Sequence, residues 1–315
     1  MIAAGAAPIV AVDGLTKRFP DVTAVDGVSF EVSRGEIFGL VGPDGCGKTT
    51  TMRMLAGVMR PEAGNVAVEG VDVVADPDDV KPHISYMPQR FGLYEDLTVD
   101  ENIRFYADLF EVPRAVREER AQRLLAASGM TRFRTFRAGQ LSGGMKQKLG
   151  LSCALVHTPK VLLLDEPTTG VDPVSRRDFW RILYDLREQG VTIIISTAYL
   201  DEAERCNRLA LLYAGRVLHC DTPAALKTRM VGALVAIESP DGRAARAAIA
   251  GLEGVSHALL VGDGVHAVVD DAPLRIPQLR AALQQAGIAV SDVAVIAPGI
   301  EDVFVTLLEN EEKPQ

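Results

Sequence analysis

Eight consecutive residues near the start of the chain have the types and spacing needed to hold a chain of phosphates. They fit the pattern G-x-x-x-x-G-K-[ST] and read Gly42, Pro43, Asp44, Gly45, Cys46, Gly47, Lys48 and Thr49, with Thr50 next to them. The glycines let backbone N–H groups turn inward, and a helix start adds partial positive charge. Lys48 is expected to reach the β- and γ-phosphates and the Thr49 hydroxyl to hold Mg²⁺. A chance glycine-rich turn is the alternative interpretation.

A pair of carboxylates follows a short apolar run further along the chain. Val161–Leu164 predicts a buried strand, and Asp165 and Glu166 stand at its end. Asp165 is suited to a second Mg²⁺ contact, and Glu166 to polarising a water for attack on a γ-phosphate. Taken alone, such a pair is often only a solvated strand end. Together with the phosphate-binding pattern, it predicts a site of nucleotide hydrolysis.

A second anion-binding pattern lies between these two. Ser142, Gly143 and Gly144 precede a helix predicted over Met145–Val156, so they form another helix N-terminus with exposed N–H groups. One nucleotide does not need two such sites in one chain. Two copies, or this chain and a homologue, could share them across an interface. The alternative is an ordinary loop followed by a helix N-cap.

Alternating strands and helices must position these residues. Strands are predicted at Ile9–Leu15, Val28–Val32, Ile37–Val41, Asn65–Val68, Val161–Leu164, Val191–Ser196, Leu209–Tyr213 and Val217–Leu218. Helices are predicted at Lys48–Val58, Val99–Phe110, Arg114–Ser128, Met145–Val156 and Pro173–Gln189, with another beginning at Leu200. This alternation predicts a largely parallel α/β sheet, with a helical insertion over Leu97–Val156.

The composition shifts towards Ala, Val and Gly after Met230. The predicted order there is strand, helix, strand, strand, helix, strand, over Leu234–Glu238, Arg243–Leu252, Val255–Val261, Val265–Val269, Leu274–Ala286 and Ala289–Ile296. That is the ferredoxin-like order, and a last helix is predicted from Ile300 to Leu308. The sequence therefore predicts an α/β nucleotide-binding domain at 8–225, with a helical subdomain at about 92–158, and a small α+β domain at 231–310.

Composition limits the partners. The net charge of −9 argues against nucleic acid as the main partner, because phosphate binding needs a basic face. The 4 cysteines show no metal-ligand spacing, which favours a reducing compartment. The apolar runs are far shorter than the roughly 20 residues of a spanning helix, so a membrane role would require a partner.

The motifs together resemble the ATP-binding subunit of ABC transporters, over about Val10 to Asp221. Gly42–Thr49 is similar to the Walker A loop, Val161–Glu166 to Walker B and Leu141–Met145 to the signature motif. The resemblance further assigns Gln89 to catalysis and metal contact, Asp172 to the D-loop, and Phe19 to stacking on adenine. It implies ATP and Mg²⁺ as ligands, transmembrane permease subunits and a second ABC ATPase module as partners, and a peripheral position on the cytoplasmic face of the inner (plasma) membrane.

Three longer sequence segments resemble those of one class of exporters. Tyr86–Asp96, Leu141–Leu151 and Ser196–Glu204 are similar to the first ATPase module of YbhF-type, ABC-2 class exporters, which are associated with efflux of drugs and small amphiphiles. The resemblance implies that the segment after Gln89 passes motion to a membrane subunit. Phe91, Leu93 and Tyr94 could form part of that docking surface, or a semi-buried loop cluster.

The chain departs from the family pattern at one position. A histidine is usual where Ala198 stands, after Ser196 and Thr197, and alanine can neither bind a γ-phosphate nor orient a water. The site could therefore hydrolyse ATP weakly, or bind ATP and leave hydrolysis to a histidine-bearing partner module. A soluble ABC ATPase of translation or repair is a third interpretation, but the chain has no second cassette and no zinc-binding cysteines.

Overall fold

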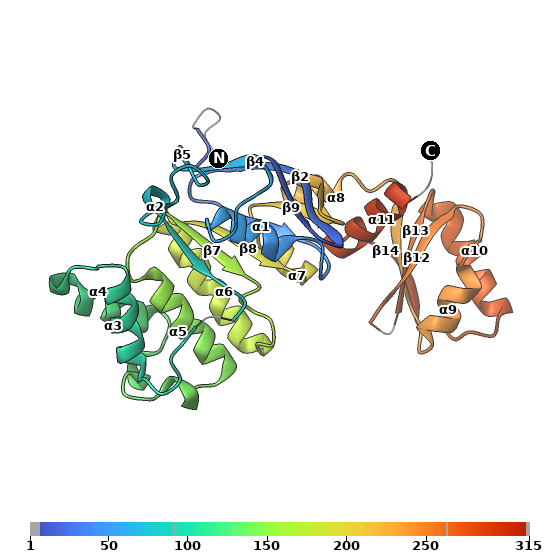
Figure 1. Cartoon of the computed structure of the whole chain (residues 1–315). Coiled ribbons are helices and arrows are strands. Elements are labelled where there is room, and N and C mark those ends of the chain that lie inside the picture. The colour runs from blue at the N-terminus through green and yellow to red at the C-terminus, as the bar shows by residue number, and fades with distance from the viewer. Residues whose placement is uncertain (1–6, 91, 263, 313–315) are drawn as a thin grey trace. The chain divides into compact units, whose positions relative to one another are not determined.

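Contacts within the chain divide it into two units, Met1–Asp221 and Thr222–Gln315. The structure is a computed structural model that describes residues 7–90, 92–262 and 264–312 (Figure 1). Each unit has its own sheet and its own hydrophobic core, so each is described by itself.

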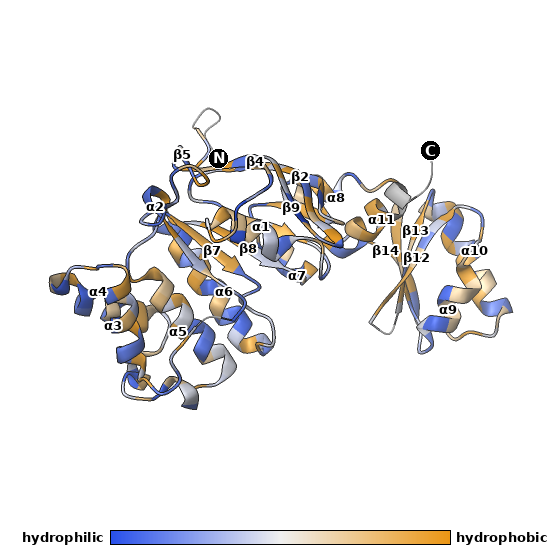
Figure 2. Ribbon diagram, in the orientation of Figure 1, coloured by the Kyte–Doolittle hydropathy of each residue, from blue (hydrophilic) through white to orange (hydrophobic). Residues whose placement is uncertain are grey.

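The first unit is built on a six-stranded sheet in the order β10-β9-β3-β8-β7-β6. Its strands are β3 (Ile37–Val41), β6 (Ile84–Met87), β7 (Val161–Asp165), β8 (Thr192–Thr197), β9 (Arg208–Tyr213) and β10 (Arg216–Asp221). All neighbours are parallel except β9 and β10, so the prediction of a largely parallel sheet is confirmed. Every residue of β3, β7 and β8 is buried, as expected for apolar runs covered on both faces (Figure 2).

Parallel pairing decides where the polar residues at the strand ends meet. Since β3, β6, β7 and β8 run in the same direction, their carboxyl ends lie on one edge of the sheet. The residues at these ends are Val41, Met87, Asp165 and Thr197. This edge therefore carries the phosphate-binding loop and both carboxylates.

A separate antiparallel sheet, in the order β2-β1-β4-β5, was not predicted. Its strands are β1 (Val10–Phe19), β2 (Val22–Val32), β4 (Ala63–Val68) and β5 (Val71–Asp72). The predicted limits Ile9–Leu15 and Val28–Val32 were too short. The β1–β2 register shifts between Val12 and Leu15, where Gly14 has a φ of +57°, so strand β1 continues through an irregularity that looks like a turn in the sequence.

Helices α1 (Lys48–Leu55) and α6 (Pro173–Glu188) are among those that pack against the central sheet. Helix α6 buries Phe179 and Trp180 completely or nearly so. Helix α1 ends earlier than the predicted Val58. Gly57 has a φ of +67°, its N–H bonds to Met54, and the Val58 N–H bonds to the Arg53 carbonyl. This is a Schellman motif, which stops the helix. Two further helices are short: α2 (Pro77–Val80) contacts β5, and α7 (Leu200–Ala203) contacts β3 and β8.

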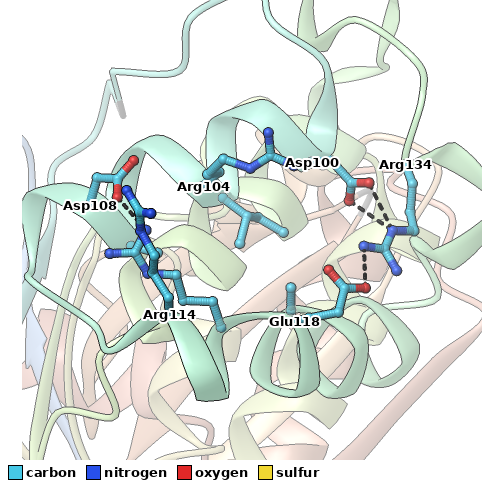
Figure 3. A pocket seen from close by; sticks show the side chains of 10 residues that line it. Asp100, Arg104, Asp108, Arg114, Glu118 and Arg134 are labelled. Carbon is cyan, nitrogen blue, oxygen red and sulfur yellow. Dashed lines mark hydrogen bonds and ion pairs between the residues drawn. The ribbon is translucent and has the colours of Figure 1, made fainter.

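Three longer helices form a group with its own apolar core, as predicted for the helical insertion. They are α3 (Val99–Leu109), α4 (Arg114–Ala127) and α5 (Gly143–Leu155), with 3₁₀ turns at Thr131–Phe133 and Ala138–Gln140. Thr98 and Glu101 form a reciprocal capping box at the start of α3. A cavity of about 320 Å³ lies between α3 and α4. Figure 3 shows Arg134, one of its lining residues, bonded to Asp100 and Glu118. Charged residues line the cavity, and ion pairs tie the two helices together there.

The second unit has a four-stranded antiparallel sheet in the order β12-β13-β11-β14. Its elements are α8 (Pro223–Lys227), β11 (Ala233–Glu238), α9 (Gly242–Ile249), β12 (Val255–Val261), β13 (Gly264–Val269), α10 (Ala272–Gln285), β14 (Asp292–Ile296) and α11 (Ile300–Glu312). Helices α9 and α10 supply Ile249, Leu279 and Leu283 to the core on one face of the sheet (Figure 1). The order of strands and helices is the one that the sequence predicts.

Candidate functional site

Lys48 begins helix α1 with its side chain turned back into the loop that precedes it. Its Nζ donates to the carbonyl oxygens of Gly42 at 2.8 Å and Pro43 at 3.0 Å. The same Nζ lies 3.2 Å from Glu166 Oε1, and only 3% of the lysine side chain is exposed. The loop therefore holds a nearly buried ammonium group between its own carbonyls and the carboxylate at the end of β7.

Two glycines of the loop are required by close backbone contacts. A Cβ on Gly42 would lie 2.2 Å from the Leu212 carbonyl oxygen and 2.7 Å from Cys46 Sγ. Gly47, at φ +106°, would place a Cβ 2.3 Å from the Ala24 carbonyl oxygen. Each distance is too short for a real side chain, so the loop keeps its curvature only with glycine at both positions.

Asp165 is almost fully buried, yet hydroxyl groups surround its carboxylate. Thr49 Oγ1 donates to its Oδ1 at 3.0 Å, Ser196 Oγ donates to the same atom at 2.7 Å, and the Tyr86 hydroxyl donates to Oδ2 at 3.2 Å. Burial and the nearby carboxylate raise the pKa of Tyr86 to about 12, so its phenol keeps its proton.

The same atoms fit a magnesium ion. Carboxylate and hydroxyl oxygens are the ligands that Mg²⁺ prefers, and it usually keeps several waters and binds substrate phosphates through the rest. Thr49 supplies a hydroxyl oxygen and Asp165 a carboxylate oxygen, and Thr49 Oγ1 lies 3.0 Å from Asp165 Oδ1. No group of three or more His, Cys, Asp or Glu side chains that could hold a metal occurs among the described residues.

Glu166 follows Asp165 with its backbone in the left-handed region, at φ +48°. Its N–H donates to Ser196 Oγ at 2.9 Å, which fixes this uncommon conformation. Gln89 Nε2 donates to Glu166 Oε2 at 2.9 Å, and Thr169 Oγ1 lies 3.5 Å from the same oxygen. The Glu166 carboxylate is thus fixed by a cation on one oxygen and by donors on the other.

Two neighbouring cavities open beside these groups. The larger, of about 400 Å³, is lined by Asp44, Gly45, Thr49, Gln89, Glu166, Thr169, Ala198 and Tyr199. The smaller, of about 120 Å³, is lined by Ala24, Gly45, Gly47, Lys48, Thr49, Thr50 and Glu166. Seven of the residues predicted to bind the nucleotide and its metal therefore line these two cavities at one sheet edge, namely Asp44, Gly45, Gly47, Lys48, Thr49, Thr50 and Gln89.

Other predicted site residues are not brought to this space. Ser142 and Gly143 are exposed at the start of α5, where Ser142 accepts a 3.4 Å bond from the Met145 N–H. A Cβ on Gly144 would lie 2.6 Å from Ser175 of α6, so this glycine permits the two helices to approach. Asp172 caps α6, accepting from the N–H groups of Val174 and Ser175.

Phe19 ends strand β1 and is 41% exposed, with Lys17 Nζ 5.9 Å from its ring centroid. Within the described part of the chain, Phe19 shows no contact with the phosphate-binding loop. Its exposure is compatible with a stacking role, which stays a prediction.

Four hydroxyl-bearing residues of the site were missed by sequence reasoning. They are Ser196, Tyr86, Thr169 and Tyr199, two of which hold Asp165 and two of which line the larger cavity. Ser196 could have been found, because it ends a predicted strand that is parallel to the strand carrying Asp165. The other three follow no spacing pattern.

Comparison with known proteins decides the family. Residues 25–169 match the family described as ABC transporter. The daunorubicin resistance ATP-binding protein DrrA3 of Streptomyces coeruleorubidus is 34% identical over 314 residues, which cover 96% of this chain and 97% of that protein. The chain belongs to the ABC transporter ATP-binding proteins. The resemblance inferred from the motifs is thus confirmed, and the family is one that hydrolyses ATP.

Other ABC transporter relatives agree with this assignment. The probable multidrug ABC transporter ATP-binding protein YbhF of Escherichia coli (strain K12) is 48% identical over 234 residues, or 74% of this chain. The chain spans 40% of the length of YbhF. A solved structure described as the ATP binding subunit of an ABC transporter superposes with a TM-score of 0.64 at 30% identity, covering 70% of this chain and 92% of that one. The P-loop ABC ATPase fold is therefore confirmed.

Proposed function

We propose that this chain hydrolyses ATP at the edge formed by β3, β6, β7 and β8 and so energises a membrane exporter. The observation that carries the hydrolysis is the meeting of Lys48, Thr49, Asp165 and Glu166, which come from two distant segments of the sequence, around one polar space. Phosphoryl transfer needs positioning and charge neutralisation more than covalent chemistry, and this set supplies both.

Each residue has a distinct role in the proposed reaction. Lys48 and the loop N–H groups bind the phosphates, and Glu166, held by Gln89, accepts the proton of the attacking water. Bound between Thr49, Asp165, Gln89 and the phosphates, Mg²⁺ would neutralise the charge on the β- and γ-phosphoryl oxygens. The nearly buried position of Lys48 strengthens its attraction for those oxygens, because the local dielectric is lower than in water.

The proposal of an exporter rests on the names of the relatives. They are a probable multidrug transporter protein, Nod factor export proteins and daunorubicin resistance proteins. We expect this chain to work with transmembrane permease subunits in moving drugs or small amphiphiles. As the ATP-binding partner of such subunits, the chain would lie peripherally on the cytoplasmic face of the membrane. None of the described helices is long and apolar enough to span a membrane. These names do not favour a role in translation or repair.

The proposal also includes a second ATPase module. Ser142 and Gly143 are exposed at the N-terminus of the 13-residue helix α5, and neither residue lines the cavities of the chain's own site. Offered to the nucleotide of a second module, this helix start would complete that module's site. The partner could be another copy or a homologue.

The C-terminal unit is proposed to be a ferredoxin-like accessory domain. Its β-α-β-β-α-β order and its sheet order β12-β13-β11-β14 support this assignment, as do helices α9 and α10 on one face. We keep the domain limits 8–225 and 231–310, with the helical subdomain at about 92–158, as part of the proposal.

Docking to the permease stays a prediction for the segment after Gln89. Phe91 lies outside the described residues. Leu93 packs partly buried against the helical core, while Tyr94 is 47% exposed and its ring centroid lies 4.6 Å from that of Phe105 in an edge-to-face arrangement. Tyr94 and Phe105 are the exposed aromatic side chains of this region that a partner could cover.

Transport tests the exporter proposal. A host strain that lacks the chain would be complemented with the wild type, with Glu166→Gln or with an empty vector, and its accumulation of ethidium measured. We expect low accumulation only with the wild type. Equal accumulation in all three strains, with ATP hydrolysis intact in the purified protein, would contradict export of this class of amphiphile.

A second candidate is favoured by Ala198, which lines the larger cavity and offers no hydrogen bond from its side chain. In that account the chain binds ATP and leaves hydrolysis to its partner module. It predicts ATP binding with no turnover above that of Glu166→Gln, and turnover restored by Ala198→His.

A further inference from the structure

The larger cavity contains four side chains that can donate a hydrogen bond, and three of them are already engaged. Thr49 donates to Asp165 at 3.0 Å, and Gln89 donates to Glu166 at 2.9 Å. Thr169 Oγ1 lies 3.5 Å from the same Glu166 oxygen. Tyr199 is the fourth of these side chains. Its hydroxyl donates no hydrogen bond within the described part of the chain.

A further donor in this space would strengthen the stabilisation of the transition state. Negative charge on the γ-phosphoryl oxygens must be met by groups fixed in advance, and removal of one such donor from an active site typically costs about 10²–10³ in kcat. Ala198 lines the same cavity and presents only a methyl group. The adjacent residue, Tyr199, carries a phenol hydroxyl, which can donate a hydrogen bond.

Tyr199 stands on a rigid support although it is 39% exposed. The Arg176 guanidinium lies 4.8 Å from the centroid of its ring, within the range of a cation–π contact. Arg176 in turn lies 3.8 Å from Asp201 and 4.0 Å from Glu202. The ring is therefore held from the side of α6.

The backbone of Tyr199 is held as well. Its N–H donates to Thr197 Oγ1 at 3.0 Å, and that hydroxyl donates to Glu202 Oε2 at 2.8 Å. Glu202 is fully buried and accepts a second bond, of 2.7 Å, from Thr168. Through Glu202, the turns that follow β7 and β8 are tied together, so Tyr199 keeps a fixed place relative to the Glu166 segment.

We propose that Tyr199 is a further catalytic residue, whose hydroxyl donates a hydrogen bond to a γ-phosphoryl oxygen during hydrolysis, and that Arg176 is a positioning residue for its ring. The proposal rests on ATP hydrolysis at this site. The water oxygen forms the new bond to the γ-phosphorus, the bond to the bridging oxygen of ADP breaks, and Glu166 takes the proton of the water. Tyr199 keeps its own proton throughout.

The test compares Mg²⁺-dependent ATP hydrolysis by full-length variants. Tyr199→Phe removes one oxygen atom and keeps the ring on Arg176. We expect kcat to fall about tenfold or more while KM changes less than about twofold, because the lost bond forms in the transition state. Tyr184→Phe, on α6 beside Trp180, is the matched control and should keep the wild-type rate.

Two double variants separate this role from a structural one. Ala198→His should raise the kcat of Tyr199→Phe several-fold and change the wild type little, because it supplies a donor to the same cavity. Arg176→Leu should lower kcat, but should add little to Tyr199→Phe, because both changes remove one function. Thermal unfolding of each variant shows that the comparison is made on folded protein.

The outcomes distinguish this proposal from the proposed function. If Tyr199→Phe keeps the wild-type kcat while Glu166→Gln is inactive, the site is correct and the role of Tyr199 is wrong. If the wild type binds ATP but turns over no faster than Glu166→Gln, and Ala198→His restores turnover, Tyr199 does not supply the donor. If Glu166→Gln keeps full activity, the proposed site itself is wrong.

Discussion

Lys48 Nζ lies 3.2 Å from Glu166 Oε1, so the cation expected to bind phosphate and the carboxylate expected to activate water are in direct contact. Lys48 begins helix α1 after the loop that follows β3, and Glu166 comes directly after β7. Their pairing means that a change in either one alters the electrostatic environment of the other.

Loss of the lysine should therefore weaken nucleotide binding. Lys48→Ala leaves Glu166 without its cation and removes the positive charge that faces the phosphates. We expect the Kd for a fluorescent ATP analogue to rise at least about tenfold, or about 1.4 kcal/mol. Lys146→Ala, which breaks only a surface pair with Glu95, serves as control. Equal Kd values for the two variants would argue against phosphate binding by Lys48.

Gln89 should affect catalysis through its bond to Glu166. Gln89→Ala removes the 2.9 Å bond that orients the carboxylate, and we expect kcat to fall about 10–100-fold with a small change in nucleotide Kd. Steady-state hydrolysis and equilibrium binding, measured on one preparation, check this. Gln189→Ala, at the C-terminal cap of α6, is the control. A fall in binding equal to the fall in kcat would show that Gln89 acts on affinity instead.

Adjacent glycines at the start of α5 should behave differently. An added Cβ on Gly144 meets Ser175 at 2.6 Å, whereas one on Gly143 meets nothing within 4 Å. Gly144→Ala should lower the free energy of unfolding by about 1–3 kcal/mol, with partial rescue by Ser175→Gly. Gly143→Ala should leave it nearly unchanged. Urea unfolding followed by the fluorescence of the single tryptophan, Trp180, measures both; equal effects would contradict this packing.

Acid should remove the contribution that ionised Asp270 makes to the stability of the C-terminal unit. Bidentate hydrogen bonding from Arg275 holds the pKa of Asp270 at about 2, below its ordinary value near 3.8. A lowered carboxylate pKa stabilises the fold above the ordinary pKa, and that stabilisation is lost as the pH falls through about 2. The stability lost in Asp270→Asn should thus be full at pH 6 and largely absent at pH 2.

The only tryptophan, Trp180, lies in the first unit, so its fluorescence follows the unfolding of that unit alone. Far-ultraviolet circular dichroism follows both units. The part of the dichroism change in urea that the fluorescence does not show therefore reports the unfolding of the C-terminal unit. Asp292→Asn, at an exposed pair with Arg280, is the control. An equal difference in the free energy of unfolding between wild type and Asp270→Asn at both pH values would contradict the assigned pKa.

Prediction from sequence succeeded where a backbone pattern fixes geometry. The loop of Gly42–Thr49 must end one strand and begin a helix, and the buried run before Asp165 must be a central strand. Parallel pairing then forces Lys48, Thr49 and Asp165 together. The family assignment followed from these motifs and was confirmed by the comparisons.

Tertiary contacts were not predictable in the same way. Nothing in the sequence shows that Glu202 is fully buried between two threonine hydroxyls, or that Arg176 lies against the ring of Tyr199. The long strand β1 was cut short because an irregularity at Gly14 resembles a turn. Such contacts depend on which distant elements pack together, and single-sequence periodicity does not contain that information.

Mg²⁺-dependent ATPase activity of the purified chain beside Glu166→Gln is the most direct test of the central claim. We predict measurable turnover in the wild type that EDTA abolishes. We also predict that Glu166→Gln binds ATP with similar affinity and loses at least about 99% of the turnover, because the amide cannot take a proton from water. Turnover by Glu166→Gln equal to the wild type would contradict the assignment of this edge of the sheet as the site of hydrolysis.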